Sequence, residues 1–338
     1  LIELLVDAGA DIEARAVEGA TALHFAAEYP ESGNVAAILL ELGAVKDARN
    51  SRGDSPLLLA AESGNLAATR ALLAAGVDPS FRHYHRRGCC ALHVAARYGY
   101  VEIIRELIWH GVHLDAVSNV GRTALHFAAS SNKADCIDAL VEAGASVNPD
   151  APAAGGDTPL HCAASGFALD AMRALLRHGA RVLALPPRAA RGGGGGVGRS
   201  HESPLHRAAV QAGRIGAAEM VDLLLRWGAD ESERDADGKT PAEAMVGQWS
   251  TACPADAERV WELLANAPAD RTWRRRGYLL LCLSRNRGAV VMMERSRGAD
   301  RKGKGKGKGN EAGDGNLAQD DGSGGSGSDG GGGGGGGG

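Results

Sequence analysis

The residues best suited to chemistry in this chain are its eleven histidines, which could bind a metal ion. Five of them occupy the same place in a phrase that returns along the chain: His24, His93, His126, His161 and His206. A zinc site needs three or four ligands that converge on one ion, whereas histidines in equivalent repeats lie in a row. The pairs His83–His85 and His110–His113 have no cysteine partners at zinc-ligand spacing. We therefore predict structural histidines and no metal ion or other cofactor.

Two glycine-containing segments come close to a phosphate-binding loop. In the first, at residues 193–200, Arg199 stands where the loop needs a lysine, and the glycines belong to a homopolymer run. In the second, at residues 238–240, the lysine is present but Glu233 replaces the first glycine. Neither segment has the strand, loop and helix that a P-loop requires. The chain also lacks the motifs of serine hydrolases, zinc proteases and kinases, so we predict that it is not an enzyme and has no small-molecule substrate.

The five histidines belong to a seven-residue phrase of the form Thr-Pro-Leu-His-x-Ala-Ala. Its copies are found at residues 21–27, 55–61, 90–96, 123–129, 158–164 and 203–209, with a shortened copy at 240–244. Successive copies begin 34, 35, 33, 35, 45 and 37 residues apart. A nearly constant period of this length indicates one supersecondary unit stacked many times. Such an array favours a binding surface over a catalytic pocket.

Each copy of the phrase predicts a tight turn followed by two helices. Threonine or serine caps the first helix, and proline fits its first position. Leucine and the alanine pair form an apolar stripe, and a second stripe that ends in an apolar pair predicts a longer amphipathic helix. A glycine after the second helix supplies a left-handed cap. An earlier glycine precedes most caps by two residues, where the chain turns tightly: Gly19, Gly53, Gly88, Gly121 and Gly238.

This phrase and the downstream Leu-Leu-x-x-Gly-Ala resemble the ankyrin repeat over roughly residues 1 to 267. The resemblance implies units of a β-hairpin and two antiparallel helices, stacked in a solenoid with a concave face. It also implies that the repeated histidine bonds to backbone between neighbouring units, and that the protein works by binding other proteins. The expected fold class is an all-α repeat solenoid with a disordered glycine-rich C-terminal tail.

The spacing of the phrase sets the expected domain limits. An array at 1–267 is followed by a basic and apolar segment at 268–300 and a disordered, low-complexity tail at 301–338. Within the array we expect a half-repeat at 1–15, repeats at about 16–49, 50–82, 83–117, 118–150, 151–185, 200–234 and 235–267, and a glycine-rich insertion at 186–199. A few residues are added around Gln211–Gly216, and the last outer helix is expected at Ala255–Asn266. The chain opens at Leu1 inside an outer helix, so we expect it to be a fragment.

Cysteine usage and charge indicate the cellular compartment and the possible binding partners. Six cysteines without a Cys-x-x-Cys pair, and no N-glycosylation sequon, predict a reduced, cytoplasmic protein, with the nucleus as an alternative. No apolar run is long enough for a transmembrane helix. Residues 268–308 carry thirteen lysines and arginines against three acids. This basic segment either packs on the last repeat, or associates with nucleic acid, an anionic membrane or an import receptor through residues 271–308.

The variable positions of the repeats are the candidates for partner contact. The resemblance implies that a partner touches the hairpin tips and the inner helices, and tyrosine and arginine are enriched at interface hot spots. The partner-binding residues that we predict are Tyr29, Arg52, Tyr84, Arg86, Arg87, Arg97, Tyr98 and Arg122. The third repeat contributes most of them. Because the surrounding repeats are net acidic, these arginines form local positive patches, and we expect a partner protein with an acidic or mixed-charge surface.

Two classes of function remain open at this stage. The first is a non-catalytic protein interaction scaffold. The second is a targeting or substrate-recruiting module of a larger enzyme, such as a kinase or a ubiquitin-ligase subunit, whose catalytic part lies before Leu1. Nothing in this sequence contains that catalytic chemistry.

Overall fold

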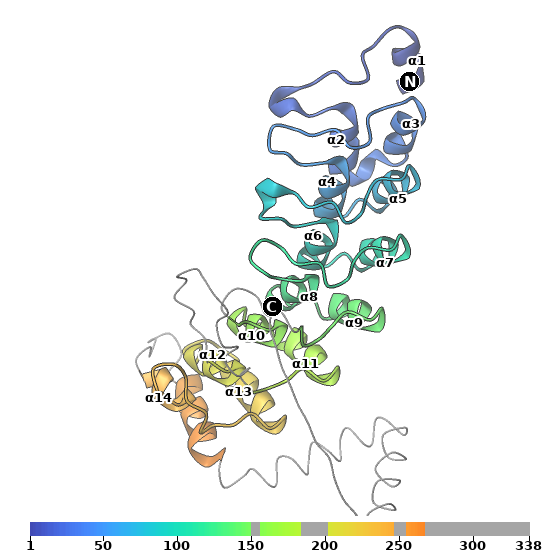
Figure 1. Cartoon of the computed structure of the whole chain (residues 1–338). Coiled ribbons are helices and arrows are strands. Elements are labelled where there is room, and N and C mark those ends of the chain that lie inside the picture. The colour runs from blue at the N-terminus through green and yellow to red at the C-terminus, as the bar shows by residue number, and fades with distance from the viewer. Residues whose placement is uncertain (150–155, 184–201, 247–254, 268–338) are drawn as a thin grey trace, which may run out of the picture. The chain divides into compact units, whose positions relative to one another are not determined.

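The computed structural model describes residues 1–149, 156–183, 202–246 and 255–267, drawn as coloured ribbon in Figure 1. All of them belong to one unit, Leu1–Cys282. The predicted insertion at 186–199, the basic segment at 268–300 and the tail at 301–338 lie outside the described residues. The limits of the individual repeats stay a prediction, and they are used below only to number the repeats.

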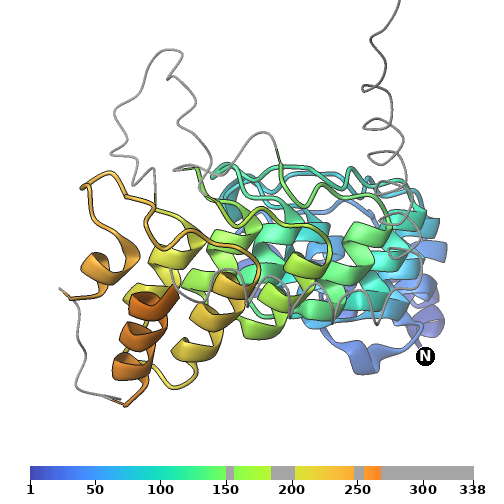
Figure 2. The same ribbon diagram turned by 90° about the horizontal axis from the view of Figure 1, so that it is seen from below.

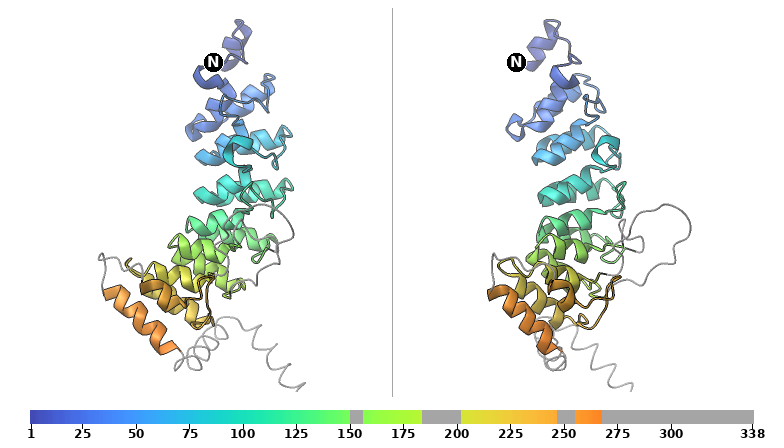
Figure 3. Two further views of the ribbon diagram at one scale, coloured as in Figure 1. Left: turned by 60° about the vertical axis from the view of Figure 1, so that its left-hand side comes forward. Right: turned by 90° about the vertical axis from the view of Figure 1, so that its left-hand side faces the viewer.

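The described helices form an inner row and an outer row (Figures 1 and 3). The inner row consists of α2 (Ala22–Glu28), α4 (Pro56–Ser63), α6 (Ala91–Tyr98), α8 (Ala124–Ser130), α10 (Pro159–Ser165), α12 (Pro204–Val210) and α14 (Pro241–Val246). The outer row consists of α1 (Ile2–Asp7), α3 (Val35–Glu41), α5 (Leu66–Ala74), α7 (Val101–Trp109), α9 (Ala134–Glu142), α11 (Leu169–Arg177) and α13 (Ala217–Arg226), followed by a helix at 255–267. Each inner helix from α2 to α12 packs on the next inner helix and on the outer helix that follows it. The described part of the chain is therefore a two-layer helical array, as predicted.

The repeated phrase supplies the core between neighbouring units. In α8, Leu125 is 1% exposed, and Ala128 and Ala129 are fully buried. The small alanine side chains let adjacent inner helices approach closely, while the leucine fills the space between the two rows. The same buried leucine and alanine pair recurs in the other complete copies of the phrase.

The repeated histidine joins most units to the next. In α2, His24 Nδ1 accepts the backbone N–H of Thr21 at 3.1 Å, and Nε2 therefore carries the proton that it donates to the Asp54 carbonyl at 3.1 Å. Equivalent bonds of 3.0 Å link His126 to Asp157, His161 to Glu202 and His206 to Lys239, each time to the residue before the next cap. His93 differs, because its Nε2 bonds at 2.9 Å to the Ala116 carbonyl near the end of its own repeat. The structural role predicted for the five histidines is confirmed.

The second repeat has no histidine in its copy of the phrase, and an imidazole from the third repeat takes its place. Leu58 occupies the histidine position in α4, and its backbone N–H donates to Ser55 Oγ. His83 belongs to the next repeat and is 3% exposed. Its Nε2 hydrogen-bonds with the Ser55 hydroxyl at 3.3 Å, and its Nδ1 lies 3.2 Å from Arg49 Nη1 and 3.3 Å from the Gly53 carbonyl. No pattern in the sequence indicates that this histidine replaces the missing one.

The hairpins are shorter than the resemblance implies. The tips project to the same side of both helix layers (Figure 2). In four of them a single backbone bond closes a five-residue turn, as in Ser118 N–H to Arg122 O at 2.9 Å. Only the longer third tip forms an antiparallel bridge among the described residues, between His83 and Cys89. Its turn depends on Gly88, which has φ +70° and leaves a Cβ no room beside the Asn119 side chain.

The irregular features predicted for the sixth and last repeats are present in the structure, and the first repeat has one that was not predicted. α12 ends at Val210 and α13 begins at Ala217, which confirms added residues in the sixth repeat. The helix at 255–267 occupies the place predicted for the last outer helix. In the first repeat, a turn of 3-10 helix at Pro30–Ser32 lengthens the connection between α2 and α3. This turn was not predicted, because the 34-residue step to the next copy of the phrase is ordinary.

Candidate partner-binding surface

The hairpin tips and the exposed side of the inner helices form one continuous surface, called here the inner surface. Within the described ranges, no group of three or more histidine, cysteine, aspartate or glutamate side chains could hold a metal ion. Nor does that part of the chain contain a helix with the length and apolar character needed to cross a bilayer. The eight residues predicted to contact a partner are therefore examined as a protein-binding surface.

Four of the predicted residues are exposed in the third repeat. Tyr84 begins the 3-10 turn Tyr84–Arg86 at the tip and is 86% exposed, and Tyr98 ends α6 with 42% exposure. Arg87 and Arg97 are exposed, and neither forms an ion pair with a carboxylate of the described residues. The Tyr98 ring stacks on Tyr100, with ring centroids 6.3 Å apart, and this stacking holds the exposed ring in place.

Arg86 differs from its neighbours because its guanidinium is already bound within the chain. Its Nε and Nη2 donate to the two Asp54 carboxylate oxygens, each at 3.0 Å, and Nη2 also donates to Glu62 at 3.1 Å. The Asp54 side chain is fully buried, and its bond to Arg86 raises the pKa of the guanidinium. Tyr98 donates its hydroxyl to Glu62 at 3.1 Å. This network, called here the Arg86 network, joins the second repeat to the third.

The sequence contains a signal for this network. An aspartate stands immediately before the Ser55 cap, and an arginine follows it 32 residues later at the tip of the next unit. A comparable pair recurs further along the array, where Asp157 precedes the Thr158 cap and Arg207 binds both of its carboxylate oxygens. For Asp54 and Asp157, the acid immediately before the cap is thus bound by an arginine of the next repeat.

Arg52 and Arg122 lie outside the third repeat, and their surroundings differ from each other. Arg52 is 58% exposed at the second tip, where its Nη2 pairs with Glu18 Oε2 at 2.9 Å. Arg122 lies immediately before the Thr123 cap, is half-buried and forms no ion pair with the described carboxylates. Its guanidinium is close enough to oppose protonation of His126, although burial is the larger reason for the lowered pKa of that imidazole.

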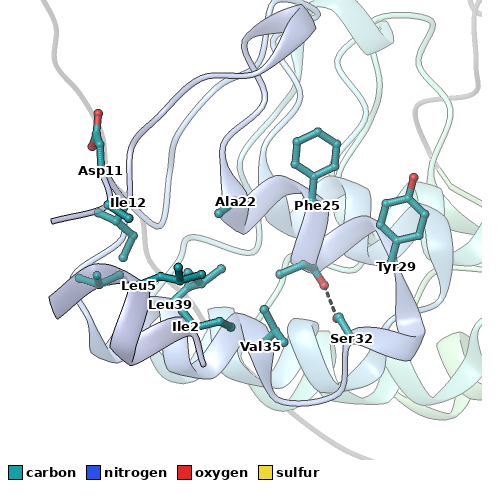
Figure 4. A pocket seen from close by; sticks show the side chains of 13 residues that line it. Ile2, Leu5, Asp11, Ile12, Ala22, Phe25, Tyr29, Ser32, Val35 and Leu39 are labelled. Atoms are coloured by element: carbon teal, nitrogen blue, oxygen red, sulfur yellow. Dashed lines mark hydrogen bonds between the residues drawn. The ribbon is translucent and has the colours of Figure 1, made fainter. Parts of the chain in front are cut away.

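Tyr29 lies apart from the other predicted residues, at the end of α2. It is 58% exposed and lines an apolar groove of about 510 Å³ between α1, α2 and α3. Figure 4 shows Phe25 and Tyr29 projecting from the same side of α2, with Ile2 and Leu39 below them. α1 packs on the outer helix α3. Among the described helices, α2 therefore has an inner-row neighbour on one side only, α4, and the groove on its other side is open. Tyr29 is thus part of this groove and lies outside the third-repeat group.

A matched pair of adjacent substitutions separates structural from accessible arginines. We expect Arg86→Ala to lower the free energy of unfolding by about 1 to 3 kcal/mol, because the buried Asp54 carboxylate loses its partner. The one-third exposure of Arg86 places the effect below that of a fully buried pair. Arg87→Ala is expected to change the free energy of unfolding by less than about 0.5 kcal/mol. Urea denaturation checks both variants, and equal losses would contradict the distinction.

Comparison with known families decides what this array is. Models of ankyrin repeats match residues 1–83, 57–151 and 92–185, and a single-repeat model matches residues 200–236. The chain belongs to the ankyrin repeat family. Its ankyrin fold is generally a non-catalytic interaction module. Among solved structures, the ankyrin repeat domain of human ASB11 is similar, with a TM-score of 0.56 and 23% identity over 71% of this chain and 98% of that one.

Two curated proteins show how ankyrin arrays of this sequence type occur in longer chains. The human SH3 and multiple ankyrin repeat domains protein 2 is 35% identical over 153 residues, which are 43% of this chain and 8% of that protein. The E3 ubiquitin-protein ligase KEG of Arabidopsis thaliana is 31% identical over 135 residues, which are 40% of this chain and 8% of that protein. The matched region thus spans less than a tenth of the length of these two relatives.

Proposed function

We propose that this ankyrin array is a non-catalytic scaffold that holds a partner protein on its inner surface, centred on the third repeat. The observation that carries the proposal is the group of exposed side chains formed by Tyr84, Arg87, Arg97 and Tyr98. Tyrosine offers a large contact area at low cost in conformational entropy, and arginine offers a rigid fork of donors. A partner with an acidic or mixed-charge surface suits these groups.

The proposal predicts that Tyr84→Ala, Arg87→Ala and Tyr98→Ala together weaken partner capture at least tenfold, or about 1.4 kcal/mol. The immobilised chain is used to capture proteins from the source cells, and the captured protein is then titrated against wild type and variant. Trp109→Ala with Arg105→Ala is the matched control, because both side chains are exposed in the same repeat but on the outer helix α7. Thermal melting checks that both variants stay folded.

Two outcomes would contradict the proposal. In the first, the α7 control loses the partner while the inner-surface variant keeps it. In the second, the inner-surface variant binds as wild type and deletion of residues 302–338 abolishes capture. The second result would move the function to the basic segment 271–308, where binding to nucleic acid or a membrane is the remaining hypothesis.

A recruiting module of a larger enzyme is the second candidate function. The similarity to the E3 ubiquitin-protein ligase KEG favours it, because an array like this one is there part of a ligase. On this hypothesis the inner surface selects the substrate and another domain of the same polypeptide modifies it. Sequencing the complete coding region tests the idea, and a reading frame without any catalytic domain would reject it.

A further inference from the structure

We propose that the third and fourth repeats bind an extended acidic segment of the partner through Arg87, Arg97 and Arg122, called here the arginine cluster. The inference rests on the proposed scaffold function and narrows its ligand from an acidic or mixed-charge protein surface to a linear stretch of carboxylates. It also changes the anchors, because Arg52 and Arg86 were expected to contact the partner and are already paired within the chain.

The pairing of inner-surface arginines is selective. Arg52 is paired with Glu18 at 2.9 Å, and Arg86 is bound by the Asp54 and Glu62 carboxylates. Arg207 is bound by Asp157 and lies 3.3 Å from Glu202. The three arginines of the cluster have no such carboxylate among the described residues. A partner's carboxylate can therefore bind them without first displacing an acid of the chain itself.

Backbone contacts bring the members of the cluster onto adjacent repeats. The Arg87 carbonyl accepts the N–H of Asn119 at 2.8 Å, which ties the third tip to the fourth. Arg122 stands in the fourth repeat at the position that Cys89 occupies in the third. Arg87 and Arg97 both lie near enough to Cys89 to favour its thiolate, although burial dominates and raises the pKa of this thiol. Arg87 and Arg97 thus lie beside Cys89 in the third repeat, and Arg122 occupies the equivalent position in the fourth.

The neighbouring repeats limit where an acidic segment can lie. The position of Arg97 on α6 corresponds to Glu28 on α2 and Glu62 on α4, but to Ser130 on α8 and Ser165 on α10. The first two repeats therefore place a carboxylate at this position, of which Glu62 is already bound by Arg86, while the fourth and fifth carry no charge there. We expect the acidic segment to run from the cluster toward the fifth repeat.

The spacing of the array sets the spacing of the ligand's carboxylates. Packed helices lie about 8 to 10 Å apart, and a peptide in the polyproline II conformation advances about 3.1 Å per residue with three residues per turn. Side chains about three residues apart in the peptide therefore meet equivalent positions of adjacent repeats. A fluorescein-labelled nonapeptide of three Glu-Glu-Ser triplets satisfies this spacing, and its Gln-Gln-Ser analogue removes only the charge.

Fluorescence anisotropy with the full chain tests the inference. We expect the Glu-Glu-Ser peptide to bind, its glutamine analogue to bind at least tenfold more weakly, and added salt to weaken the interaction. Arg87→Gln, Arg97→Gln and Arg122→Gln together should weaken binding of the acidic peptide at least tenfold. The matched control is Arg70→Gln, Arg105→Gln and Arg173→Gln, which removes the same charge from exposed arginines of the outer helices α5, α7 and α11. Thermal melting confirms that both variants are folded.

Several results would overturn the inference. The first is an acidic peptide that binds no better than its glutamine analogue. The second is a cluster variant that binds the acidic peptide as wild type does, and the third is an outer-helix control that loses as much affinity as the cluster variant. Equal affinity for a nine-nucleotide oligouridylate would show a general polyanion site in place of a peptide site. A captured partner that is lost with the Tyr84, Arg87 and Tyr98 variant but kept by the cluster variant would reject this inference and leave the scaffold function intact.

Discussion

Lowering the pH from 7 to 4 is expected to remove about 3 kcal/mol of stability for each of three buried histidines. Burial lowers the pKa of His93, His126 and His161 to about 4, from an ordinary value near 6.5. Between these two values the unfolded chain binds the proton and the folded chain does not. Stability is therefore fully present above pH 6.5 and falls as the pH drops toward 4. Burial also lowers the pKa of His24 and His83, which adds to the effect in the same direction.

Urea denaturation at half-unit steps from pH 7 to pH 4 measures this loss. A matched variant is His126→Leu, because Leu58 shows that leucine is tolerated at the same position of another repeat. The variant loses hydrogen bonds and is less stable at pH 7, so the informative quantity is the slope of the unfolding free energy with pH. We expect that slope to decrease by at most about a third, because His93 and His161 remain and His24 and His83 also contribute. A flat profile between pH 6.5 and 4.5 in the wild-type protein would contradict the proton linkage.

Leu125→Ala is expected to lower the free energy of unfolding by about 2 to 4 kcal/mol. The side chain is 1% exposed in α8, and its removal leaves a cavity between packed inner and outer helices. Val45→Ala is a suitable control, because Val45 is 52% exposed and its loss should cost less than about 0.5 kcal/mol.

The loss at Leu125 should also be local. α8 packs on α6, α9 and α10, so the third to fifth repeats share its contacts directly. In a repeat array each unit is coupled mainly to its neighbours. Hydrogen exchange should therefore accelerate most strongly in those repeats. Uniform acceleration from α2 to α13 would argue against nearest-neighbour coupling.

The helices and the histidine bonds were predictable because they recur with the period of the chain. Each position in the phrase has one role, so a single interpretation of His24 also applied to His126 and His206. The same regularity predicted the outer helix at 255–267, although the spacing before it is irregular.

The state of the arginines was not predictable in the same way. Arg86 and Arg87 are adjacent in the sequence and chemically identical, yet only Arg86 reaches the buried Asp54 carboxylate. Which of two neighbouring side chains makes such a contact depends on the backbone of the tip, where Arg87 adopts φ +56° and Arg86 lies in a helical turn. Composition and periodicity say nothing about that local geometry, and an equal partner-binding role was predicted for both residues.

Because His83 of the third repeat supplies the imidazole that bonds to Ser55, the second repeat depends on its neighbour in a way that the repeats with their own histidine do not. Elsewhere a unit brings its own histidine and can be recombined with any neighbour that offers a backbone carbonyl. The second unit, with Leu58, is complete only beside a unit whose tip carries a histidine at the place of His83. A duplication or engineered shuffle that placed it before the fourth repeat would set Ser118 opposite the Ser55 hydroxyl and leave that hydroxyl without its imidazole partner. This contact constrains the order of the second and third repeats, as the Asp157–Arg207 pair constrains the order of the fifth and sixth.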